Sequence, residues 1–181
     1  MFDMDGVLTD TETIWDEVRR ELARQDQVPW PDDATEAMMG MSTPEWSAYL
    51  VGTVGLRGTA RDAAERTIEE MARRYRDHLP TMPGAVTAVE RLAGRWPLGL
   101  ASSSPRLLID TVLDALGLAE HFDVTVSTEE VERGKPAPDG YRRACELLGV
   151  APDRAVAVED SSNGIRSAAA AGMHVIAVPH E

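Results

Sequence analysis

Two aspartates near the start of the chain, Asp3 and Asp5, have a residue type and a spacing that suit chemistry. In extended backbone, side chains two positions apart point to the same side, so both carboxylates can face one pocket. Such a pair can hold a hard cation such as Mg2+, or supply a nucleophile and an acid–base group. Gly6 follows and permits a tight turn. The alternative is an ordinary surface turn, in which Asp and Gly are common for their backbone preferences alone.

Three serines follow residues 97–101, an apolar run that is predicted to form a strand. Ser102, Ser103 and Ser104 precede a predicted helix, with Ser104 as its expected N-cap and Pro105 as its first residue. Serine hydroxyls and free N–H groups at the start of a helix can bind an anion. Helix capping explains the same residues, so the serines alone leave both interpretations open.

A lysine and two further acids complete the candidate set. Lys135 lies in a predicted loop bounded by glycine and proline, where it can supply the positive charge that an acidic chain needs to bind an anion. Glu159 and Asp160 follow a predicted strand over 155–158; such acids are either helix caps or metal ligands, and Asp160 and Ser161 could cap the following helix. Ligands of open parallel sheets bind beyond the carboxyl ends of the strands, where all these residues are expected. A carboxylate nucleophile with a metal ion, a lysine and hydroxyl donors suits phosphoryl transfer.

The segments that must position these residues alternate between helices and strands after Gly84. Strands are predicted at 97–101, 122–126, 155–158 and 174–178, and helices lie between them. Strands separated by helices form βαβ units with parallel strands and right-handed crossovers. We therefore expect an α/β fold, a Rossmann-like parallel sheet with helices on both faces.

A helical block interrupts this pattern. Residues 13–81 are predicted to form about four helices, with Ser42 as the N-cap of one of them and residues 51–58 as only a connection. We expect this block to be an inserted α-helical cap bundle. The α/β catalytic core is then built from residues 1–12 and 82–181.

Composition limits the classes of partner. Lys and Arg total 18 against 31 Asp and Glu, a net charge of −13, which argues against nucleic acid and anionic membranes. No run approaches the roughly 18 apolar residues of a membrane helix, and we expect no signal peptide, because Asp3 and Asp5 come almost at once. The single cysteine, Cys145, cannot form an internal disulfide. We expect a cytoplasmic monomer that acts on a small phosphorylated metabolite.

The whole set of motifs resembles the haloacid dehalogenase superfamily of phosphohydrolases over nearly the full chain. The resemblance is carried, in chain order, by the motifs Asp3–Asp10, Ser102, Lys135 and Glu159–Asp160. It implies that Asp3 is the nucleophile that forms an aspartyl-phosphate. It also implies that Asp5 protonates the leaving oxygen and then activates water, and that Ser102 and Lys135 hold the phosphate.

The same resemblance implies a Mg2+ cofactor. Its ligands would be the side chain of Asp3, the backbone carbonyl of Asp5, the side chain of Asp160, and Glu159 directly or through water. The helical insert resembles the helical cap of this superfamily, which closes over the substrate and excludes water.

Three residues bear on the subgroup. The dehalogenases lack the second aspartate, so Asp5 argues against dehalogenation. The β-phosphoglucomutases carry a histidine where this chain has Trp15, and an arginine for a second phosphate where it has Thr43. The chain more closely resembles the phosphatases of hexose, 2-deoxyhexose or hexitol phosphates. Expected substrate-binding residues are Glu12, Trp15, Met41, Ser103 and Ser104.

Two departures from the family pattern keep alternatives open. Only Met1 and Phe2 precede Asp3, and the family usually continues with another strand and helix beyond the last predicted strand. Fewer buried aliphatic side chains, each worth about 1.5–3 kcal/mol, predict a lower stability than that of a longer relative. A mutase, and a shortened relative that binds a phosphorylated ligand without turnover, are the alternatives to a phosphatase.

Overall fold

The computed structural model describes residues 1–38 and 41–178 of the 181-residue chain. The chain divides into two compact units. Unit 1 combines Met1–Thr11 with His78–Glu181, and unit 2 is the intervening segment Glu12–Asp77.

The sheet of unit 1 contains two parallel strand pairs. Strand β1 (Gly99–Ser102) pairs with β2 (Val124–Ser127), and β3 (Val156–Glu159) pairs with β4 (His174–Ala177). Every residue of β1 is buried, as expected for a strand inside a parallel sheet. The predicted strands are therefore confirmed, with ends shifted by a few residues.

Residues 1–3 join the two strand pairs. Phe2 forms parallel bridges to both Leu100 and Val158, and the Asp3 N–H donates to the Val158 carbonyl at 3.0 Å. The order across the sheet is therefore β2, β1, residues 1–3, β3, β4. The strand order reverses at residues 1–3, and the crevice at such a reversal is where open α/β sheets bind ligands.

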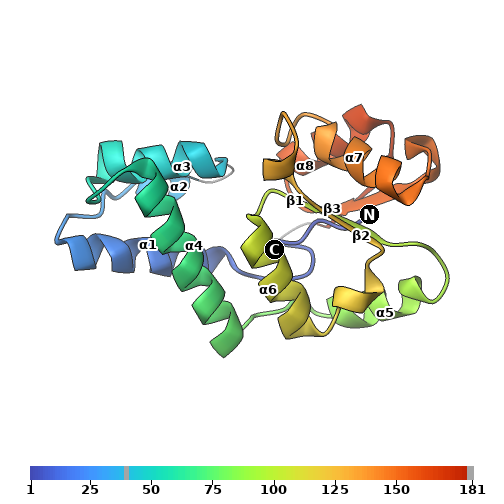
Figure 1. Ribbon diagram of the computed structural model, residues 1–181, viewed down its shortest axis with the longest axis horizontal. Coiled ribbons are helices and arrows are strands. Elements are labelled where there is room, and N and C mark those ends of the chain that lie inside the picture. Colours follow the sequence, from blue (N-terminus) through green and yellow to red (C-terminus); the bar gives the residue numbers. More distant parts are fainter. Residues whose placement is uncertain (39–40, 179–181) are drawn as a thin grey trace. The chain divides into compact units, whose positions relative to one another are not determined.

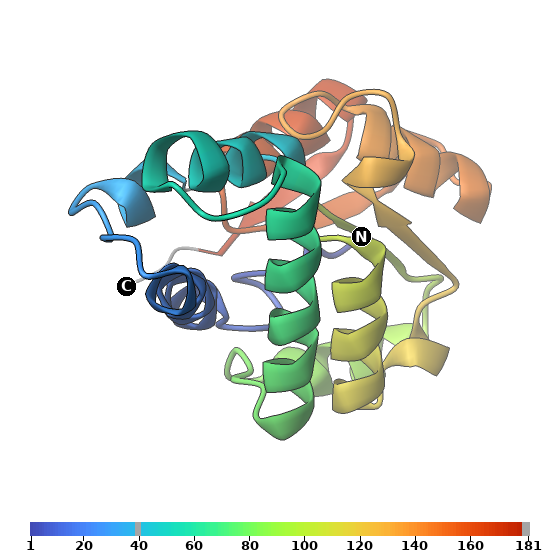
Figure 2. The ribbon, with the colours of Figure 1, turned by 60° about the vertical axis from the view of Figure 1, so that its left-hand side comes forward.

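Helices cover both faces of this sheet. Figures 1 and 2 show α7 (Asp139–Leu148) and α8 (Ser162–Ala171) on one face and α5 (Ala85–Ala93) and α6 (Arg106–Leu116) on the other. The core under α7 and α8 contains small side chains, among them Ala101, Ala157 and Ala168. Short 3-10 helices occur at Ala119–His121, Thr128–Glu130 and Pro152–Arg154. The predicted α/β fold with a parallel sheet is confirmed.

Unit 2 is helical throughout its regular structure. Its elements are α1 (Glu12–Asp26), α2 (Ala34–Ala37), α3 (Thr43–Tyr49), the π-helix Leu50–Val54 and α4 (Ala60–Asp77). The Ser42 N–H donates to the Glu45 carboxylate at 2.8 Å, so the expected capping box is present. The prediction of a mere connection over 51–58 was wrong in its first part, because buried Leu50 and Val54 continue α3 as the π-helix.

One ion pair ties together the two long helices of unit 2. Two guanidinium nitrogens of Arg66, on α4, donate to the two carboxylate oxygens of Asp26, on α1, at 2.9 Å each. The Arg57 N–H donates to the same carboxylate at 2.8 Å. The Arg66 hydrogen bonds hold the pKa of Asp26 below its usual value. Within residues 1–38 and 41–178, no helix has both the length and the apolar character needed to cross a membrane.

Candidate active site

A tight turn after residues 1–3 presents the first two acids. Gly6 has a φ of 77°, a conformation that glycine adopts without steric cost, and its N–H donates to the Thr9 carbonyl at 2.7 Å. The Leu8 N–H bonds back to the Met4 carbonyl at 2.8 Å, and both side chains are fully buried. The turn is thus anchored by its apolar residues.

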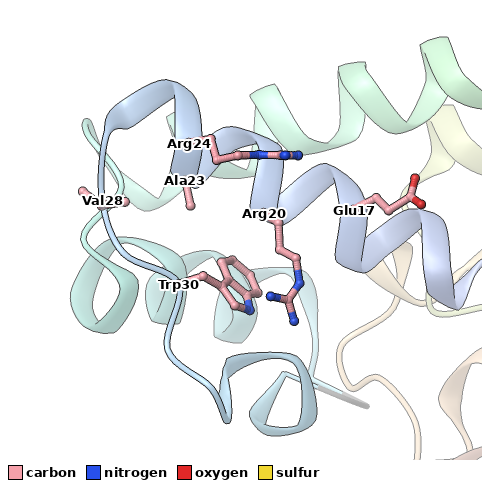
Figure 3. A pocket seen from close by; sticks show the side chains of 6 residues that line it. All are labelled: Glu17, Arg20, Ala23, Arg24, Val28 and Trp30. Atoms are coloured by element: carbon pink, nitrogen blue, oxygen red, sulfur yellow. The ribbon is translucent and has the colours of Figure 1, made fainter.

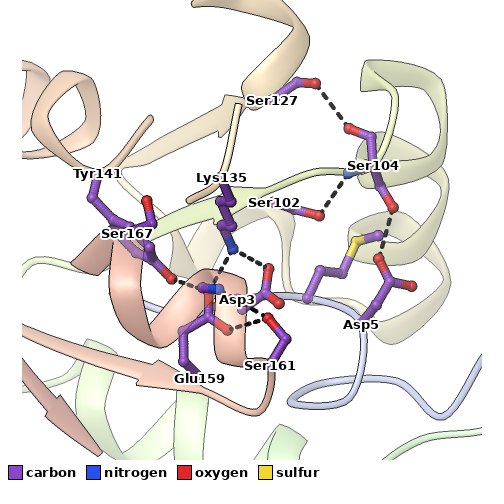
Figure 4. Close-up of polar contacts among 12 residues, drawn as sticks. Asp3, Asp5, Ser102, Ser104, Ser127, Lys135, Tyr141, Glu159, Ser161 and Ser167 are labelled. Carbon is purple, nitrogen blue, oxygen red and sulfur yellow. Dashed lines mark hydrogen bonds and ion pairs between the residues drawn. The ribbon is translucent and has the colours of Figure 1, made fainter. Parts of the chain in front are cut away.

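Lys135 lies between two acids that come from opposite ends of the chain. Its Nζ donates to Asp3 Oδ1 at 2.9 Å and to Glu159 Oε1 at 2.6 Å (Figure 4). The Lys135 side chain is only 6% exposed and that of Glu159 is fully buried. A buried charge is stable only when it is paired and hydrogen-bonded, and each member of this group meets that condition.

Burial sets the titration of these groups. Desolvation raises the pKa of Asp3 to about 7, and the nearby Lys135 ammonium opposes that rise. Burial works against the charge on Lys135, but the attraction of Asp3 and Glu159 outweighs it and raises the pKa of Lys135. Lys135 therefore stays cationic, while Asp3 is a carboxylate whose charge depends on positive neighbours.

Asp5 has a different environment from Asp3. Its Oδ1 accepts a hydrogen bond from the Thr11 hydroxyl at 2.6 Å, and its Oδ2 accepts one from the Ser104 hydroxyl at 2.7 Å. Desolvation raises the pKa of Asp5, and these hydroxyl donors limit the increase. One acid is thus paired with an ammonium and the other is held by hydroxyls, and two carboxyl groups in such different environments can take different roles.

The serine run after β1 is divided between different roles. Ser102 is buried and its Oγ accepts the Ser104 N–H at 3.0 Å, whereas Ser103 is exposed. The expectation that Ser104 caps the next helix was wrong. Pro105 is the N-cap of α6, and the Ser104 hydroxyl donates a hydrogen bond to Asp5 instead.

Glu159 is enclosed by more donors than the sequence indicated. The Tyr141 hydroxyl donates to Oε1 at 2.7 Å, and the Ser161 hydroxyl donates to Oε2 at 3.3 Å. Ser161 is also the N-cap of α8 and accepts the Gly164 N–H at 3.0 Å. A Cβ on Gly164 would lie 1.9 Å from the Glu159 carboxylate, so only glycine leaves room for this side chain.

Three of these acids fit a divalent cation. Asp3, Glu159 and Asp160 each offer one oxygen, and the three oxygens lie within 4.8 Å of one another. Asp5 adds a fourth carboxyl group, which interacts electrostatically with Asp3, with Asp160 and with the Lys135 ammonium. Oxygen ligands and excess negative charge suit a hard cation such as Mg2+. The structure thus brings together three of the four residues predicted as metal ligands, and the predicted contribution of the Asp5 carbonyl stays a prediction.

Three of the predicted substrate-binding residues, Glu12, Trp15 and Met41, lie in unit 2. Glu12 is exposed at the start of α1, and Met41 is half-buried before α3. Trp15 is half-buried, and its ring meets that of Trp46 edge-on at 5.9 Å, with the Arg19 guanidinium 4.8 Å from its centroid. These contacts give Trp15 a packing role within unit 2, whatever its role toward a substrate.

Unit 2 also has a pocket of about 300 Å³ (Figure 3). Its lining consists of Glu17, Arg20, Ala23, Arg24, Val28 and Trp30. The Arg20 guanidinium lies 5.2 Å from the centroid of the Trp30 ring and also pairs with Asp16. None of the residues predicted to act on a substrate lines this pocket.

The sequence interpretation did not assign four residues to the acidic site, namely Thr11, Tyr141, Ser161 and Gly164, although its suggestion that Ser161 caps the following helix is confirmed. Thr11 and Ser161 each lie close in sequence to a predicted acid, so the sequence alone could have suggested that their hydroxyls donate to these acids. Tyr141 lies on an apolar helix face and has the pattern of a core residue. The need for glycine at 164 follows only from the position of Glu159.

Acids at the switch point of a parallel α/β sheet, with a buried lysine and hydroxyl donors, suit a class of proteins that transfer phosphoryl groups. Comparison with known proteins identifies the family. Residues 1–172 match the haloacid dehalogenase-like hydrolases. The chain belongs to this family, as its motifs predicted, and the prediction that it is an enzyme is confirmed.

Relatives and solved structures agree with this assignment. The chain is 34% identical to the phosphorylated carbohydrates phosphatase of Thermotoga maritima, over 97% of this chain and 82% of that protein. It is 32% identical to hexitol phosphatase B of Escherichia coli, over 99% of this chain and 82% of that protein. The crystal structure of Rhodobacter sphaeroides CbbY in complex with phosphate superimposes with a TM-score of 0.87 at 28% identity, covering 99% of this chain and 85% of that one.

Proposed function

We propose that this chain is a Mg2+-dependent phosphatase that hydrolyses a sugar phosphate through an aspartyl-phosphate. The observation that carries the proposal is the contrast between Asp3, paired with Lys135 at 2.9 Å, and Asp5, held by the hydroxyls of Thr11 and Ser104. Two neighbouring carboxyl groups in such different environments suit two different roles. The phosphatase names of the relatives support a phosphate monoester as substrate.

The proposed reaction has two steps. An Asp3 carboxylate oxygen attacks phosphorus and forms the aspartyl-phosphate, the ester P–O bond breaks, and the Asp5 carboxyl gives its proton to the leaving alkoxide. In the second step the Asp5 carboxylate takes a proton from water. That water attacks phosphorus, inorganic phosphate leaves, and Asp3 is regenerated.

The remaining residues stabilise charge. Lys135 Nζ neutralises the buried Asp3 carboxylate, and we propose that it also holds phosphoryl oxygens together with the Ser102 hydroxyl. Asp3, Glu159 and Asp160 would hold Mg2+, with the carbonyl of Asp5. A bound Mg2+ supplies positive charge to the phosphoryl oxygens.

Unit 2 is proposed to be the cap that selects the substrate, with Glu12, Trp15 and Met41 as the residues that contact the sugar. Ser103 and Ser104 are proposed to bind it from the core. The relatives' names, a phosphorylated carbohydrates phosphatase and a hexitol phosphatase, support a sugar phosphate as the ligand of these residues. A cytoplasmic location and a monomeric state remain predictions.

Phosphate release from a panel of hexose, deoxyhexose and hexitol phosphates, with and without Mg2+, tests the proposal. Release should require Mg2+ and should be lost in Asp3→Asn. Asp114→Asn is the matched control, because Asp114 is an exposed aspartate on α6. No release from folded wild-type protein on any member of the panel would favour a relative that binds without turnover.

A mutase is the second candidate. A Thermotoga maritima structure provisionally named a β-phosphoglucomutase matches with a TM-score of 0.80 and 34% identity, over 99% of this chain and 84% of that one. Thr43 offers no charge for a second phosphate at the start of α3. Conversion of a hexose 1-phosphate to its 6-phosphate, stimulated by a sugar bisphosphate and faster than phosphate release, would favour the mutase.

A further inference from the structure

Tyr141 is a fully buried residue of α7 whose hydroxyl forms a hydrogen bond with Glu159. Its ring belongs to the apolar core under α7 and α8. A ring alone would fill that space, but a buried hydroxyl needs a partner. The hydroxyl donates to Glu159 Oε1 at 2.7 Å, so this tyrosine connects the core to the acidic site (Figure 4).

The same tyrosine contacts both members of a buried ion pair. Glu159 Oε1 accepts the Tyr141 hydroxyl and also the Lys135 ammonium, at 2.6 Å. The Lys135 ammonium in turn lies 5.0 Å from the centroid of the Tyr141 ring, within the range of a cation–π contact.

Two further contacts restrict the Glu159 carboxylate. Ser161 donates to Oε2 at 3.3 Å, and the backbone of Gly164 lies against the whole carboxylate. The Tyr141 bond is shorter than the Ser161 bond and comes from a side chain that is itself immobilised in the core. Of Tyr141, Ser161 and Gly164, the Tyr141 hydroxyl is therefore the best placed to set the orientation of Glu159.

We propose that Tyr141 is a positioning residue whose hydroxyl orients Glu159 and thereby sets the affinity of the Asp3–Glu159–Asp160 group for its cation. The inference rests on the Mg2+ dependence proposed above. Groups that orient a metal ligand in this way typically change metal affinity or activity about 10–100-fold when they are removed. A tyrosine that only fills the core would leave the cation affinity unchanged when its hydroxyl is removed.

Tyr141→Phe removes the hydroxyl and keeps the ring. Titration calorimetry with Mg2+ alone should show a dissociation constant raised about 10–100-fold, and saturating Mg2+ should restore kcat toward the wild-type value. Tyr75→Phe is the matched control, because Tyr75 is a buried tyrosine on α4 in unit 2. Its Mg2+ dissociation constant should equal that of the wild type.

The outcomes separate this inference from the proposed function. Wild-type protein that binds no Mg2+ overturns both. Wild-type protein that binds Mg2+ no more tightly than Tyr141→Phe overturns the role of Tyr141 alone, and so does an equal loss in Tyr75→Phe.

A second measurement covers the case in which Tyr141→Phe does not fold. The chain has three tyrosines, so 3-fluorotyrosine labelling gives three 19F signals. Tyr49→Phe and Tyr75→Phe assign the Tyr141 signal by elimination. Saturating Mg2+ should shift the Tyr141 signal while the Tyr75 signal stays in place, and an unmoved Tyr141 signal overturns the proposal.

Discussion

Lys135 Nζ and Asp3 Oδ1 are 2.9 Å apart, although their residues are separated by 132 positions in the chain. The contact is buried, and the same ammonium also neutralises Glu159. One cation therefore stabilises two carboxylates that would otherwise repel each other in a dry environment. We therefore expect both the stability of the fold and the proposed chemistry to depend on this lysine.

Lys135→Met should lower both the stability of the fold and the rate of phosphate release. Removing one partner leaves two buried carboxylates without their cation, which we expect to cost about 3–5 kcal/mol in the free energy of unfolding. The value of kcat should fall about 10²–10³-fold, since a preorganised positive group is lost. Urea denaturation and steady-state phosphate release check the two effects. Arg133→Met, which removes an exposed arginine nearby in sequence, should change neither by a comparable amount.

Gly164→Ala should disturb Glu159 directly. The new Cβ would lie 1.9 Å from the carboxylate, so the side chain or the start of α8 must move. We expect a loss of about 1–3 kcal/mol in unfolding free energy. Mg2+ affinity should weaken as well.

Gly94→Ala is the matched control for that substitution. Gly94 has a φ of −73°, and apart from its chain neighbours no atom lies within 4 Å of the position that an alanine Cβ would occupy, so alanine fits. Its unfolding free energy should stay within about 1 kcal/mol of the wild type in thermal or urea denaturation. If both alanine variants are equally stable and bind Mg2+ equally well, the close contact between Gly164 and Glu159 is not a constraint.

Ser104→Ala removes the hydroxyl that donates to Asp5 Oδ2 at 2.7 Å. A hydrogen bond to a charged group is worth about 1.5–3 kcal/mol, and if Asp5 is the acid–base group kcat should fall about 10–100-fold. Steady-state phosphate release at saturating substrate measures the effect. Ser162→Ala, at an exposed serine that begins α8, should keep the wild-type rate. Equal rates for the two variants would argue against a hydroxyl-held Asp5 in catalysis.

The Asp26–Arg66 pair predicts a dependence of stability on pH. The folded state lowers the pKa of Asp26 from its ordinary value of 3.8, so the pair stabilises the fold fully above that value. The contribution is lost as the pH falls below 3.8 and through the folded-state pKa. Asp26→Asn should therefore be about 1.5–3 kcal/mol less stable than the wild type at neutral pH, and the difference should shrink in acid.

Urea denaturation at a series of pH values from about 3 to 7 measures that difference. Asp33→Asn serves as the control, because Asp33 is an exposed residue whose side chain makes no capping hydrogen bond to α2. A difference between Asp26→Asn and the wild type that stays constant down to the lowest pH would contradict the assignment.

The sequence predicted the parts of the site that follow from local rules. Asp3, Glu159 and Asp160 end strands, and the rule that parallel strands bring their carboxyl ends together was enough to group them. Ser104 was misassigned because its local pattern fits a helix cap equally well, and only the distant Asp5 decides the role of its hydroxyl.

Tyr141 and Gly164 depend on packing between distant segments. Each acquires its role only when Glu159 lies against it, and no local periodicity contains that information. Helix and strand positions were thus accessible from residue spacing, whereas the contacts that orient the site were not.

The central position of residues 1–3 in the sheet has a consequence for biosynthesis. Their two neighbours, β1 and β3, lie roughly 100 and 155 residues further along, so the ribosome has made most of the chain before both are available. Such long-range pairing is slow, because loop-closure entropy must be overcome first. A nascent chain that stops before β3 lacks Glu159 and one of the two strands that hold Phe2 and Asp3 in the sheet, so the acidic site can form only late in synthesis.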